Sequence, residues 1–336
     1  MTVPATMLEQ ALDFPRQLRS GLAAGDAAGM ADRRPAAVAL CGLGGSAAGG
    51  RLLTALFAEL LAVPVVSVDT TSLPAWVGED TLVVCISYSG QTAETLWLWD
   101  EAGDRGALRA AITAGGTLAV NAEAIGAPCA LVEPGFQPRG ALGLLLGALV
   151  GLLDLAGAVP GAAALLAAAV PSVEAVVAEE RAHPAVARAE AERLAGHAVV
   201  FYGSGARAAA AVRLKHQVNE NAKAAAWAGA MPEMAHNEIL GWLGCQRHDL
   251  RAAAIFLRDV DEPPAPRDLH DRITAIVAGD VPTVIEWRGT GETELERTLA
   301  LLVHGDVVSC HLADVEGVDA LDITRLTGLK AASVSE

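Results

Sequence analysis

The stretch Ala37-Val-Ala-Leu-Cys-Gly-Leu-Gly-Gly-Ser46 passes from a short apolar run into a glycine-rich turn. Such a run before such a turn is typical of a buried β-strand whose carboxyl end leads into a helix. The alanine- and leucine-rich residues 47–61 predict that helix, and further buried strands are expected at 65–68 and 82–86. Strands that alternate with helices indicate a parallel sheet with helices on both faces.

Strand 82–86 ends in a second turn, Ser87-Tyr-Ser-Gly-Gln-Thr92, before another predicted helix. Short strands at 118–121 and 130–132 are expected to complete the sheet. The opening pattern returns at Ala198-Val-Val-Phe-Tyr-Gly-Ser-Gly205. Because the two halves open alike, we infer an internal duplication of one doubly wound α/β domain.

An alanine-rich helical stretch, interrupted by prolines, separates the two halves. We therefore expect an N-terminal domain over residues 1–158, a helical bridge over 159–194 and a C-terminal domain over 195–336. After its first strand, the C-terminal domain is expected to contain a helix, two further strands and a long helix, over 206–220, 252–257, 281–287 and 292–312.

The composition excludes several classes of protein. Of 336 residues, 52% are hydrophobic and 19% are charged, which excludes a disordered chain. The formal net charge of −16, from 24 basic and 40 acidic residues, argues against a nucleic-acid partner. An anionic substrate would have to be held by local groups. The five cysteines form no Cys-x-x-Cys pair and are expected to be thiols in a reducing cytoplasm.

The most apolar stretch is Ala141–Leu153, which has 13 residues without a charge. A membrane span needs about 20 such residues. Glycines recur at every fourth position, as Gly143, Gly147 and Gly151, which is typical of a face on which two helices pack closely. We expect a buried helix here and no membrane association. The first 14 residues lack the basic start of a signal peptide.

Two of the predicted turns have the composition of a phosphate site. Gly44-Gly45-Ser46 lets the backbone approach a ligand, and the free N–H groups of the following helix favour an anion. Ser87, Ser89 and Thr92 add three hydroxyl groups at the other turn. Such residues also cap helices, but two such turns in one domain favour phosphate. The chain lacks the nucleotide motifs GxGxxG and GxxxxGK[ST]. The two turns also contain no lysine, which favours a phosphate monoester over a triphosphate.

The candidate acid–base groups are Glu220, in Asn219-Glu220-Asn221, and His236, in the stretch 232–238. A carboxylate and an imidazole suit proton abstraction beside a carbonyl together with sugar ring opening. Arg139 could neutralise a developing enediolate, and Lys223 could pair with Glu220. Each also has a plainer interpretation: Glu220 as a surface carboxylate, His236 as a capping or core histidine, and Arg139 as an ion-pair partner.

Together these segments resemble the bifunctional phosphoglucose/phosphomannose isomerases of the sugar isomerase (SIS) domain superfamily. The resemblance runs in order from about residue 37 to the C-terminus. It is carried by Gly44-Gly45-Ser46, Ser87-Tyr-Ser-Gly-Gln-Thr-Ala-Glu-Thr95, Pro138-Arg139, Asn219-Glu220-Asn221-Ala-Lys223 and Pro232-Glu-Met-Ala-His-Asn-Glu-Ile-Leu-Gly-Trp242.

The resemblance implies a homodimer in which each subunit has two SIS domains. It implies the isomerisation of glucose 6-phosphate or mannose 6-phosphate to fructose 6-phosphate, without a metal or cofactor. By motif position, the phosphate would be held by Gly45, Ser46, Ser87, Ser89 and Thr92.

The same resemblance assigns the catalytic roles. Glu220 would move a proton between C1 and C2, and Arg139 would stabilise the enediolate. His236, from the partner subunit, would assist ring opening. Lys330 matches a lysine in the family's final helix.

The chain departs from the family near its C-terminus. Asp319-Ala320-Leu321 stands where the family has an Asp-Pro-Thr-like turn, and the tail after Lys330 is short. The preference between glucose and mannose therefore stays open. Two alternatives also stay open: an isomerase of another phosphosugar, and a non-catalytic sugar-phosphate-binding SIS protein. The second usually carries a DNA-binding helix-turn-helix, which the acidic N-terminus does not show.

Overall fold

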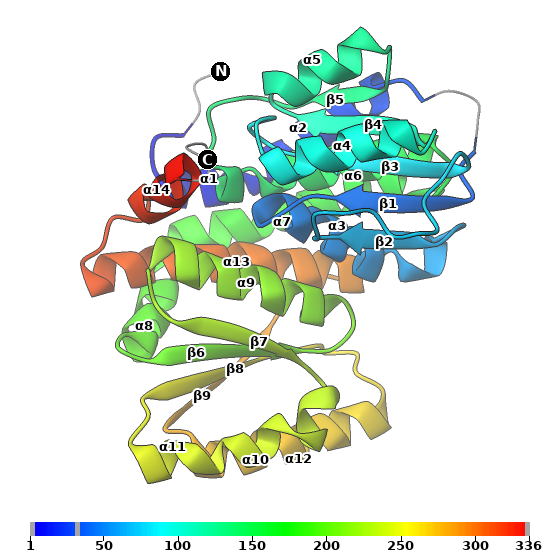
Figure 1. The fold of residues 1–336 in the computed structure, drawn as a ribbon. Coiled ribbons are helices and arrows are strands. Elements are labelled where there is room, and N and C mark those ends of the chain that lie inside the picture. Colours follow the sequence, from blue (N-terminus) through cyan, green and yellow to red (C-terminus); the bar gives the residue numbers. More distant parts are fainter. Residues whose placement is uncertain (1–3, 31–33, 333–336) are drawn as a thin grey trace.

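The structure is a computed structural model that describes residues 4–30 and 34–332. Two parallel sheets, one from each half of the chain, lie with helices between and outside them (Figure 1). Within the described residues, the first sheet has the order β2-β1-β3-β4-β5, from β1 Ala37–Cys41, β2 Val65–Val68, β3 Thr81–Ile86, β4 Leu108–Thr113 and β5 Cys129–Leu131. The second has the order β7-β6-β8-β9, from β6 Ala198–Gly203, β7 Ala226–Ala230, β8 Ala252–Arg258 and β9 Thr283–Arg288. The predicted α/β class with parallel sheets is confirmed.

The helices follow the strands in the predicted alternation. Those of the first half are α1 Met7–Leu12, α2 Phe14–Ala27, α3 Gly45–Leu56, η1 Ala58–Leu60, α4 Ala93–Asp104, α5 Gly116–Ala124, η2 Pro138–Gly140 and α6 Leu142–Leu155. Then come α7 Ala162–Ala182 and α8 Pro184–Leu194. The second half has α9 Ala206–Asn221, η3 Glu233–His236, α10 Glu238–Gly241, α11 Leu243–His248, α12 Pro264–Asp280, α13 Glu294–Glu316 and α14 Thr324–Ala332.

The two halves share the order of their first four strands. In each sheet the first strand of the half pairs with the second on one side and the third on the other. The turns after the first strands also match: Gly44 has φ 55° and ψ −124°, and Gly205 has φ 55° and ψ −128°. A positive φ of this kind favours glycine. The structure therefore agrees with an internal duplication.

Two strands differ from the sequence prediction. Residues 118–121 lie in helix α5, where the predicted strand is wrong, and β4 occupies the place in the sheet. β4 was missed because Arg109 interrupts its apolar run. That side chain is placed over the ring of Trp99, 5.0 Å from the ring centroid, which hides its charge from the core. β7 was missed because its sequence, AWAGA, is mostly small residues and it lies at the sheet edge.

The predicted close-packed helix is α6, which packs against α2. A Cβ atom added at Gly147 would lie 2.5 Å from the carbonyl oxygen of Leu18, and one at Gly143 would lie 2.9 Å from that of Phe14. Real Cβ atoms do not approach so closely, so only glycine allows this contact. The helix is buried from Leu142 to Leu153, and this prediction is confirmed.

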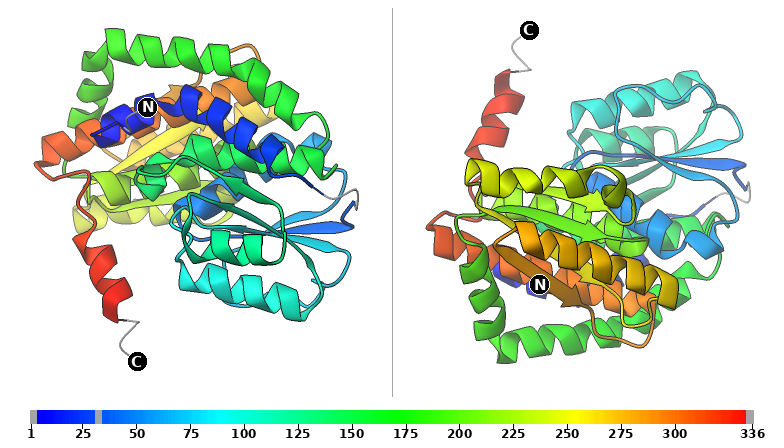
Figure 2. Two further views of the ribbon diagram at one scale, coloured as in Figure 1. Left: turned by 90° about the horizontal axis from the view of Figure 1, so that it is seen from above. Right: turned by 90° about the horizontal axis from the view of Figure 1, so that it is seen from below.

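Among the described residues, α7 and α13 are long and apolar enough to cross a membrane by length and composition. Both pack within the fold instead of standing apart from it (Figure 2). The most apolar window of α13 is 83% buried, and that of α7 is 33% buried. α7 contributes one face to the core, through Leu166, Val170, Val173 and Val177.

Candidate active site

The hydroxyl-rich turn, residues 87–92, begins where β3 ends. The Ser87 and Thr92 hydroxyl oxygens lie 2.9 Å apart, and Ser89 is exposed beside them. Thr92 is the N-cap residue of α4, yet its side chain makes no capping hydrogen bond. The alternative in which this hydroxyl merely caps a helix is therefore wrong for Thr92. Its present hydrogen-bond partner is the Ser87 hydroxyl, and a ligand oxygen could take the place of that partner.

The glycine-rich turn lies next to it, because β1 and β3 are neighbours in the sheet. A Cβ atom at Gly42 would lie 3.0 Å from the carbonyl oxygen of Ile86, the residue before Ser87. Ser46, in the first turn of α3, is buried. The two predicted phosphate turns therefore meet at the carboxyl edge of the first sheet, which is where ligands of parallel α/β sheets bind.

Arg139 reaches this edge from η2, which follows β5. A Cβ atom at Gly45 would lie 3.3 Å from the carbonyl oxygen of Pro138, so the two segments touch. The Arg139 side chain is 2% exposed and ends 3.7 Å from the carboxylate of Glu220, between Nη1 and Oε2. Its Nε donates to Asn221 Oδ1 at 2.7 Å, and its Nη2 donates to the carbonyl oxygen of Ala320.

Burial lowers the pKa of Arg139, and the nearby Arg213 lowers it further, while Glu220 opposes both. A guanidinium stays protonated in proteins in spite of such a shift. The separation of 3.7 Å between Arg139 and Glu220 is longer than a hydrogen bond. The Nη1 group is therefore not committed to the carboxylate, and it can turn towards a negative charge on a ligand.

Glu220 lies in the last turn of α9 and opens into a cavity of 480 Å³. Its side chain is 28% exposed, so a ligand can reach it. The cavity is lined by Asn219, Glu220, Lys223, Asp322, Ile323, Thr324, Arg325 and Leu326. Its volume is in the range usual for small-molecule sites.

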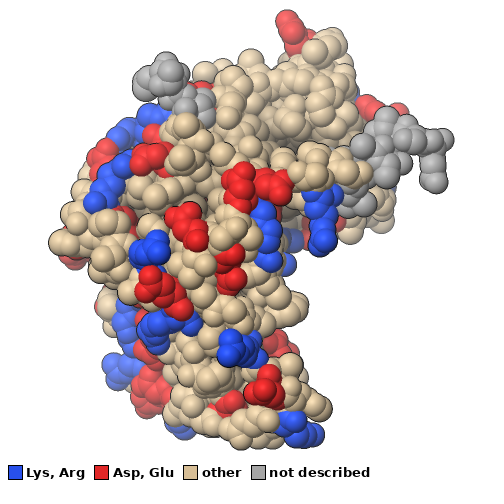
Figure 3. All heavy atoms as spheres, turned by 90° about the vertical axis from the view of Figure 1, so that its left-hand side faces the viewer, with Lys and Arg blue, Asp and Glu red and all other residues tan. Residues whose placement is uncertain are grey.

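The cavity walls come from the end of α9 and the start of α14, the helix that extends from the body of the molecule in Figure 2. Figure 3 shows the side of the molecule on which α14 lies. Acidic and basic side chains are interspersed there and do not form one broad basic surface.

Lys223 does not pair with the Glu220 carboxylate, so that expectation is wrong. The helix ends at Asn221, and Lys223 takes a φ of 53°, which turns it out of the helical register that the prediction assumed. Its Nζ donates to the backbone carbonyl oxygens of Glu220 at 3.0 Å and Asp319 at 2.5 Å. Burial lowers the pKa of Lys223, and Arg139 lowers it further.

His236 lies at the far end of the second sheet from Glu220. α9 begins at the carboxyl end of β6 and runs back along the sheet, so Glu220 lies at the amino end. β7 then runs to the carboxyl end, where the N–H of Met231 donates to the carbonyl oxygen of Gly203 at 2.8 Å and η3 follows. A helix of sixteen residues, as in α9, spans about 24 Å. Within one subunit, the exposed His236 therefore lies far from Glu220.

Lys330 falls in α14 at a position whose side chain lies outside the described residues. Its predicted role stays a prediction. The Ala320 carbonyl oxygen, in the turn that departs from the family pattern, accepts a hydrogen bond from Arg139. This turn is therefore tied to the site by its backbone, which any residue can supply.

A buried polar network behind Arg139 was not predicted from the sequence. Asn221 is fully buried, and its Nδ2 donates to Ser309 Oγ at 2.9 Å. Arg213 Nη2 donates to the backbone carbonyl oxygen of Arg139 at 2.7 Å and pairs with Asp306 at 2.8 Å. The only sequence signal would have been polar residues within the apolar run of α13.

The second sheet carries different chemistry at its equivalent edge. β8 is the counterpart of β3 in strand order, but it ends at Arg258, and Asp259 follows. Arg258 pairs with Glu262 at 2.8 Å, and Asp259 pairs with Arg207. Ion pairs therefore fill the place where the first domain has hydroxyl groups. In the part of the chain that the structure describes, no three His, Cys, Asp or Glu side chains are grouped to hold a metal ion.

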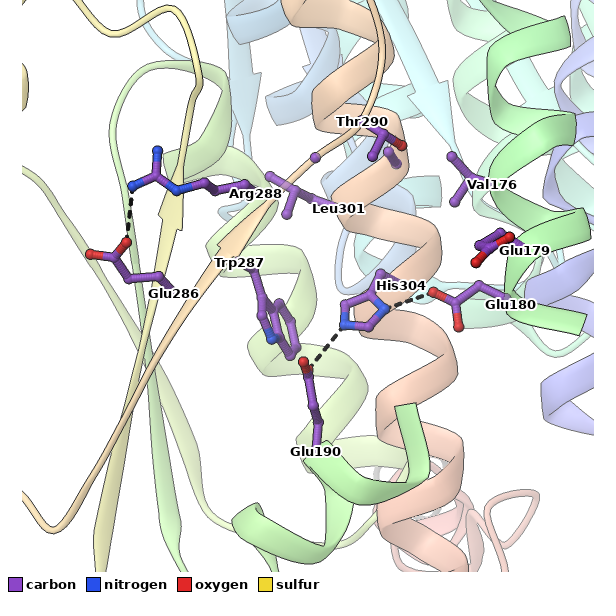
Figure 4. A pocket seen from close by; sticks show the side chains of 12 residues that line it. Val176, Glu179, Glu180, Glu190, Glu286, Trp287, Arg288, Thr290, Leu301 and His304 are labelled. Atoms are coloured by element: carbon purple, nitrogen blue, oxygen red, sulfur yellow. Dashed lines mark hydrogen bonds and ion pairs between the residues drawn. The ribbon is translucent and has the colours of Figure 1, made fainter. Parts of the chain in front are cut away.

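A second cavity, of 320 Å³, lies between α7, α8, α13 and β9 (Figure 4). His304 lies between two carboxylates, with Nδ1 2.7 Å from Glu180 and Nε2 3.0 Å from Glu190. Burial alone would lower the pKa of His304, but the two carboxylates outweigh it and raise the pKa to about 9. The imidazolium therefore joins three helices as a structural ion cluster.

Both halves of the chain fold as α/β domains with a parallel sheet, and the family models identify each of them as a SIS domain. The family model of the SIS domain matches residues 33–130, and that of the bacterial phospho-glucose isomerase C-terminal SIS domain matches residues 184–332. A solved structure of a hypothetical protein from Thermus thermophilus has the same fold, with a TM-score of 0.73 at 18% identity over 99% of this chain and 91% of that one.

The family follows from the relatives. The bifunctional phosphoglucose/phosphomannose isomerase of Aquifex aeolicus is 33% identical over 302 residues, which cover 87% of this chain and 89% of that protein. The chain belongs to the bifunctional phosphoglucose/phosphomannose isomerase family. A D-glucosamine-6-phosphate 4-epimerase of Sulfolobus acidocaldarius is also 33% identical, over 229 residues that cover 68% of this chain and 71% of the epimerase.

Proposed function

We propose that this protein is an aldose–ketose isomerase that interconverts glucose 6-phosphate, mannose 6-phosphate or both with fructose 6-phosphate. The observation that carries the proposal is the pair formed by Glu220 and Arg139, 3.7 Å apart, where the phosphate-type turns of the first domain meet the end of α9. A partly exposed carboxylate beside a buried cation is the arrangement that an enediolate intermediate requires. Membership of the family supports the same reaction.

In the proposed mechanism the phosphate of the open-chain sugar binds at Ser46, Ser87, Ser89 and Thr92. The hydroxyl groups and the N–H groups at the start of α3 hold it without a metal. Anchoring the phosphate on C6 fixes where the rest of the open chain lies in the site, so C2, the carbon that loses its proton, is held against Glu220. Such positioning makes the proton transfer effectively intramolecular.

Glu220 takes the proton from C2 of the aldose, and the electron pair forms the C1–C2 double bond of an enediolate whose negative charge lies on O1. Arg139 Nη1 donates to that oxygen. A proton then passes from O2 to O1, and Glu220 returns its proton to C1, which leaves the carbonyl group of the ketose at C2. General base catalysis of this kind contributes about 10²–10⁴-fold.

His236 is proposed to act in the site of a partner subunit, where it would move a proton between the ring oxygen and O1 during ring opening. Its position at the opposite end of the second sheet from Glu220 supports donation to another subunit. A homodimer, with two such sites, is therefore part of the proposal, as is a location in the cytoplasm.

An isomerase or epimerase of another phosphosugar is the second candidate. The epimerase relative from Sulfolobus acidocaldarius, at 33% identity, favours it. The phosphate turns would hold any phosphosugar, and the base would serve any reaction that begins with removal of a proton beside a carbonyl group. A substrate panel that includes glucosamine 6-phosphate separates the two candidates.

The test uses two variants separately and mixed. Glu220→Gln and His236→Ala homodimers should each lose at least about 10²-fold in kcat. Unfolding and refolding the two together gives mixed dimers, in which one site has Glu220 and the partner's His236 both intact. Recovery of activity supports Glu220 as the base and supports a site that is shared between two subunits. A mixture as inactive as its parents would refute the sharing, and near-normal turnover by Glu220→Gln would refute the base.

A further inference from the structure

We propose that Asn221 is a positioning residue that keeps Arg139 aimed at the substrate and apart from the carboxylate of Glu220. The inference rests on the proposed function and adds a residue to it. Asn221 lies next to Glu220 at the end of α9, on the buried side, and is 0% exposed.

The evidence is a hydrogen-bond chain with one possible direction. Arg139 Nε donates to Asn221 Oδ1 at 2.7 Å, Asn221 Nδ2 donates to Ser309 Oγ at 2.9 Å, and Ser309 Oγ donates to the carbonyl oxygen of Asp306 at 2.7 Å. A guanidinium has only donors, so the amide oxygen must face it. The Ser309 hydroxyl uses its one hydrogen in the bond to the backbone carbonyl oxygen of Asp306, so it can only accept from Asn221, and the amide nitrogen must face it.

This direction makes the amide group hard to replace. A carboxylate at position 221 could accept from Arg139 but could not donate to Ser309, and it would pair with the guanidinium as a full negative charge. An alanine would leave Arg139 Nε without an acceptor in a place where a buried unpaired donor is costly. A neutral amide holds the guanidinium by a hydrogen bond without neutralising it, so the positive charge of Arg139 stays available for the enediolate.

The geometry also explains why Arg139 stays 3.7 Å from Glu220. Three contacts fix it: Asn221 at Nε, Ala320 at Nη2, and Arg213, which donates to its backbone carbonyl oxygen at 2.7 Å. Without Asn221, the guanidinium would be free to turn onto the Glu220 carboxylate, which already lies 3.7 Å from Nη1. A close ion pair would then hold the base ionised and remove the cation from the enediolate.

Glu220 faces Arg139 from η2, and it shares its cavity with Lys223, just after α9, and with Asp322 and Arg325 at the start of α14. The substitutions at position 221 leave these last three groups in place and act through Arg139 and the new side chain, so they have opposite effects on pH dependence. In Asn221→Ala, the closer cation favours the ionised carboxylate, and the acid limb of kcat/KM moves to lower pH. In Asn221→Asp, the added negative charge disfavours ionisation of Glu220, and the acid limb moves to higher pH. Both variants should lower kcat by about 10²-fold with KM within about threefold, because Arg139 acts on the transition state.

The control is Thr298→Val. Thr298 is fully buried in α13, as Ser309 is, but its hydroxyl has no partner among the described residues and it lies outside the hydrogen-bond chain. This variant reports what a buried polar-to-apolar change in α13, the helix that holds Ser309, does to folding. It should keep the wild-type kcat and pH profile.

A binding measurement separates this inference from the proposed function. The probe is the five-carbon aldonic acid phosphate, whose carboxylate carries a negative charge like that of the enediolate. Calorimetry should show that both Asn221 variants lose at least tenfold more affinity for it than for fructose 6-phosphate. Wild-type protein that binds the probe but turns over neither hexose refutes the proposed reaction only. Parallel losses for both ligands, or acid limbs that do not move, refute the role of Asn221.

Discussion

Replacement of His304 by glutamine should cost about 2–3 kcal/mol of the free energy of unfolding at pH 7. His304 has an unfolded pKa near 6.5 and a folded pKa of about 9, and its side chain is 19% exposed. At about 1.4 kcal/mol for each pH unit, this interval corresponds to about 3 kcal/mol. Because the folded pKa is raised, the stabilisation is complete below about pH 6.5 and is lost as the pH rises through about 9.

The assay is urea unfolding of wild type and His304→Gln at pH 6, 7, 8, 9 and 10. The stability difference between the two should shrink steadily from pH 7 to pH 10. His183→Gln is the matched control: its ring lies 3.5 Å from Glu179, but its side chain is 61% exposed. An exposed pair of this kind is worth well under about 1 kcal/mol. A His304→Gln loss no larger than that of the control, or a difference independent of pH, would refute the reasoning.

Three further predictions concern the site and the second domain. Gly90→Ala should destabilise the protein by about 2–4 kcal/mol, because φ is 65° and the new Cβ would lie 1.8 Å from the carbonyl oxygen of Gly115. Gly78→Ala, which meets no atom within 4 Å, is its control in thermal unfolding, and equal Tm shifts would contradict the argument. Glu262→Gln should cost about 3 kcal/mol at neutral pH: burial opposes ionisation, but Arg258 and the other donors lower the pKa of Glu262 to about 2. Since that pKa lies below the unfolded value of 4.5, the difference from wild type should be complete above about pH 4.5 and shrink as the pH falls through about 2; a constant difference in acid unfolding would count against it. Arg139→Lys should lower kcat by about 10²-fold with little change in KM, since an ammonium group cannot keep both guanidinium hydrogen bonds, to Asn221 and to Ala320, and still reach the enediolate. Steady-state kinetics with an unchanged kcat would show that Arg139 is only an ion-pair partner.

The strand-turn-helix repeats could be predicted because they are local signals. Apolar runs such as 37–41 and 82–86 are too short for buried helices and end at turn residues, which favours strands, and these turns fix where the next helix begins. β4 and β7 could not be predicted in this way. Arg109 depends on Trp99, a partner from another element, and the small residues of β7 gain their structure from pairing with β6.

The same contrast between local signals and distant contacts applies to the candidate site. Motif positions predicted Glu220 and Arg139, and the structure brings these two side chains together. It does not bring them to His236 within one chain. The wrong expectation for Lys223 came from extending α9 past Asn221, where the backbone turns. The hydrogen bonds of Asn221 to Arg139 and Ser309 join residues 82 and 88 positions apart, and spacing along the chain does not reveal them.

The central claim is that this chain isomerises hexose phosphates with its own side chains. The most direct test is a coupled assay of purified protein with glucose 6-phosphate and mannose 6-phosphate offered separately, in the presence of EDTA. The account predicts fructose 6-phosphate from at least one of them, at a rate that EDTA does not change and that Glu220→Gln abolishes. No fructose 6-phosphate from either sugar, or activity that survives in Glu220→Gln, would contradict it.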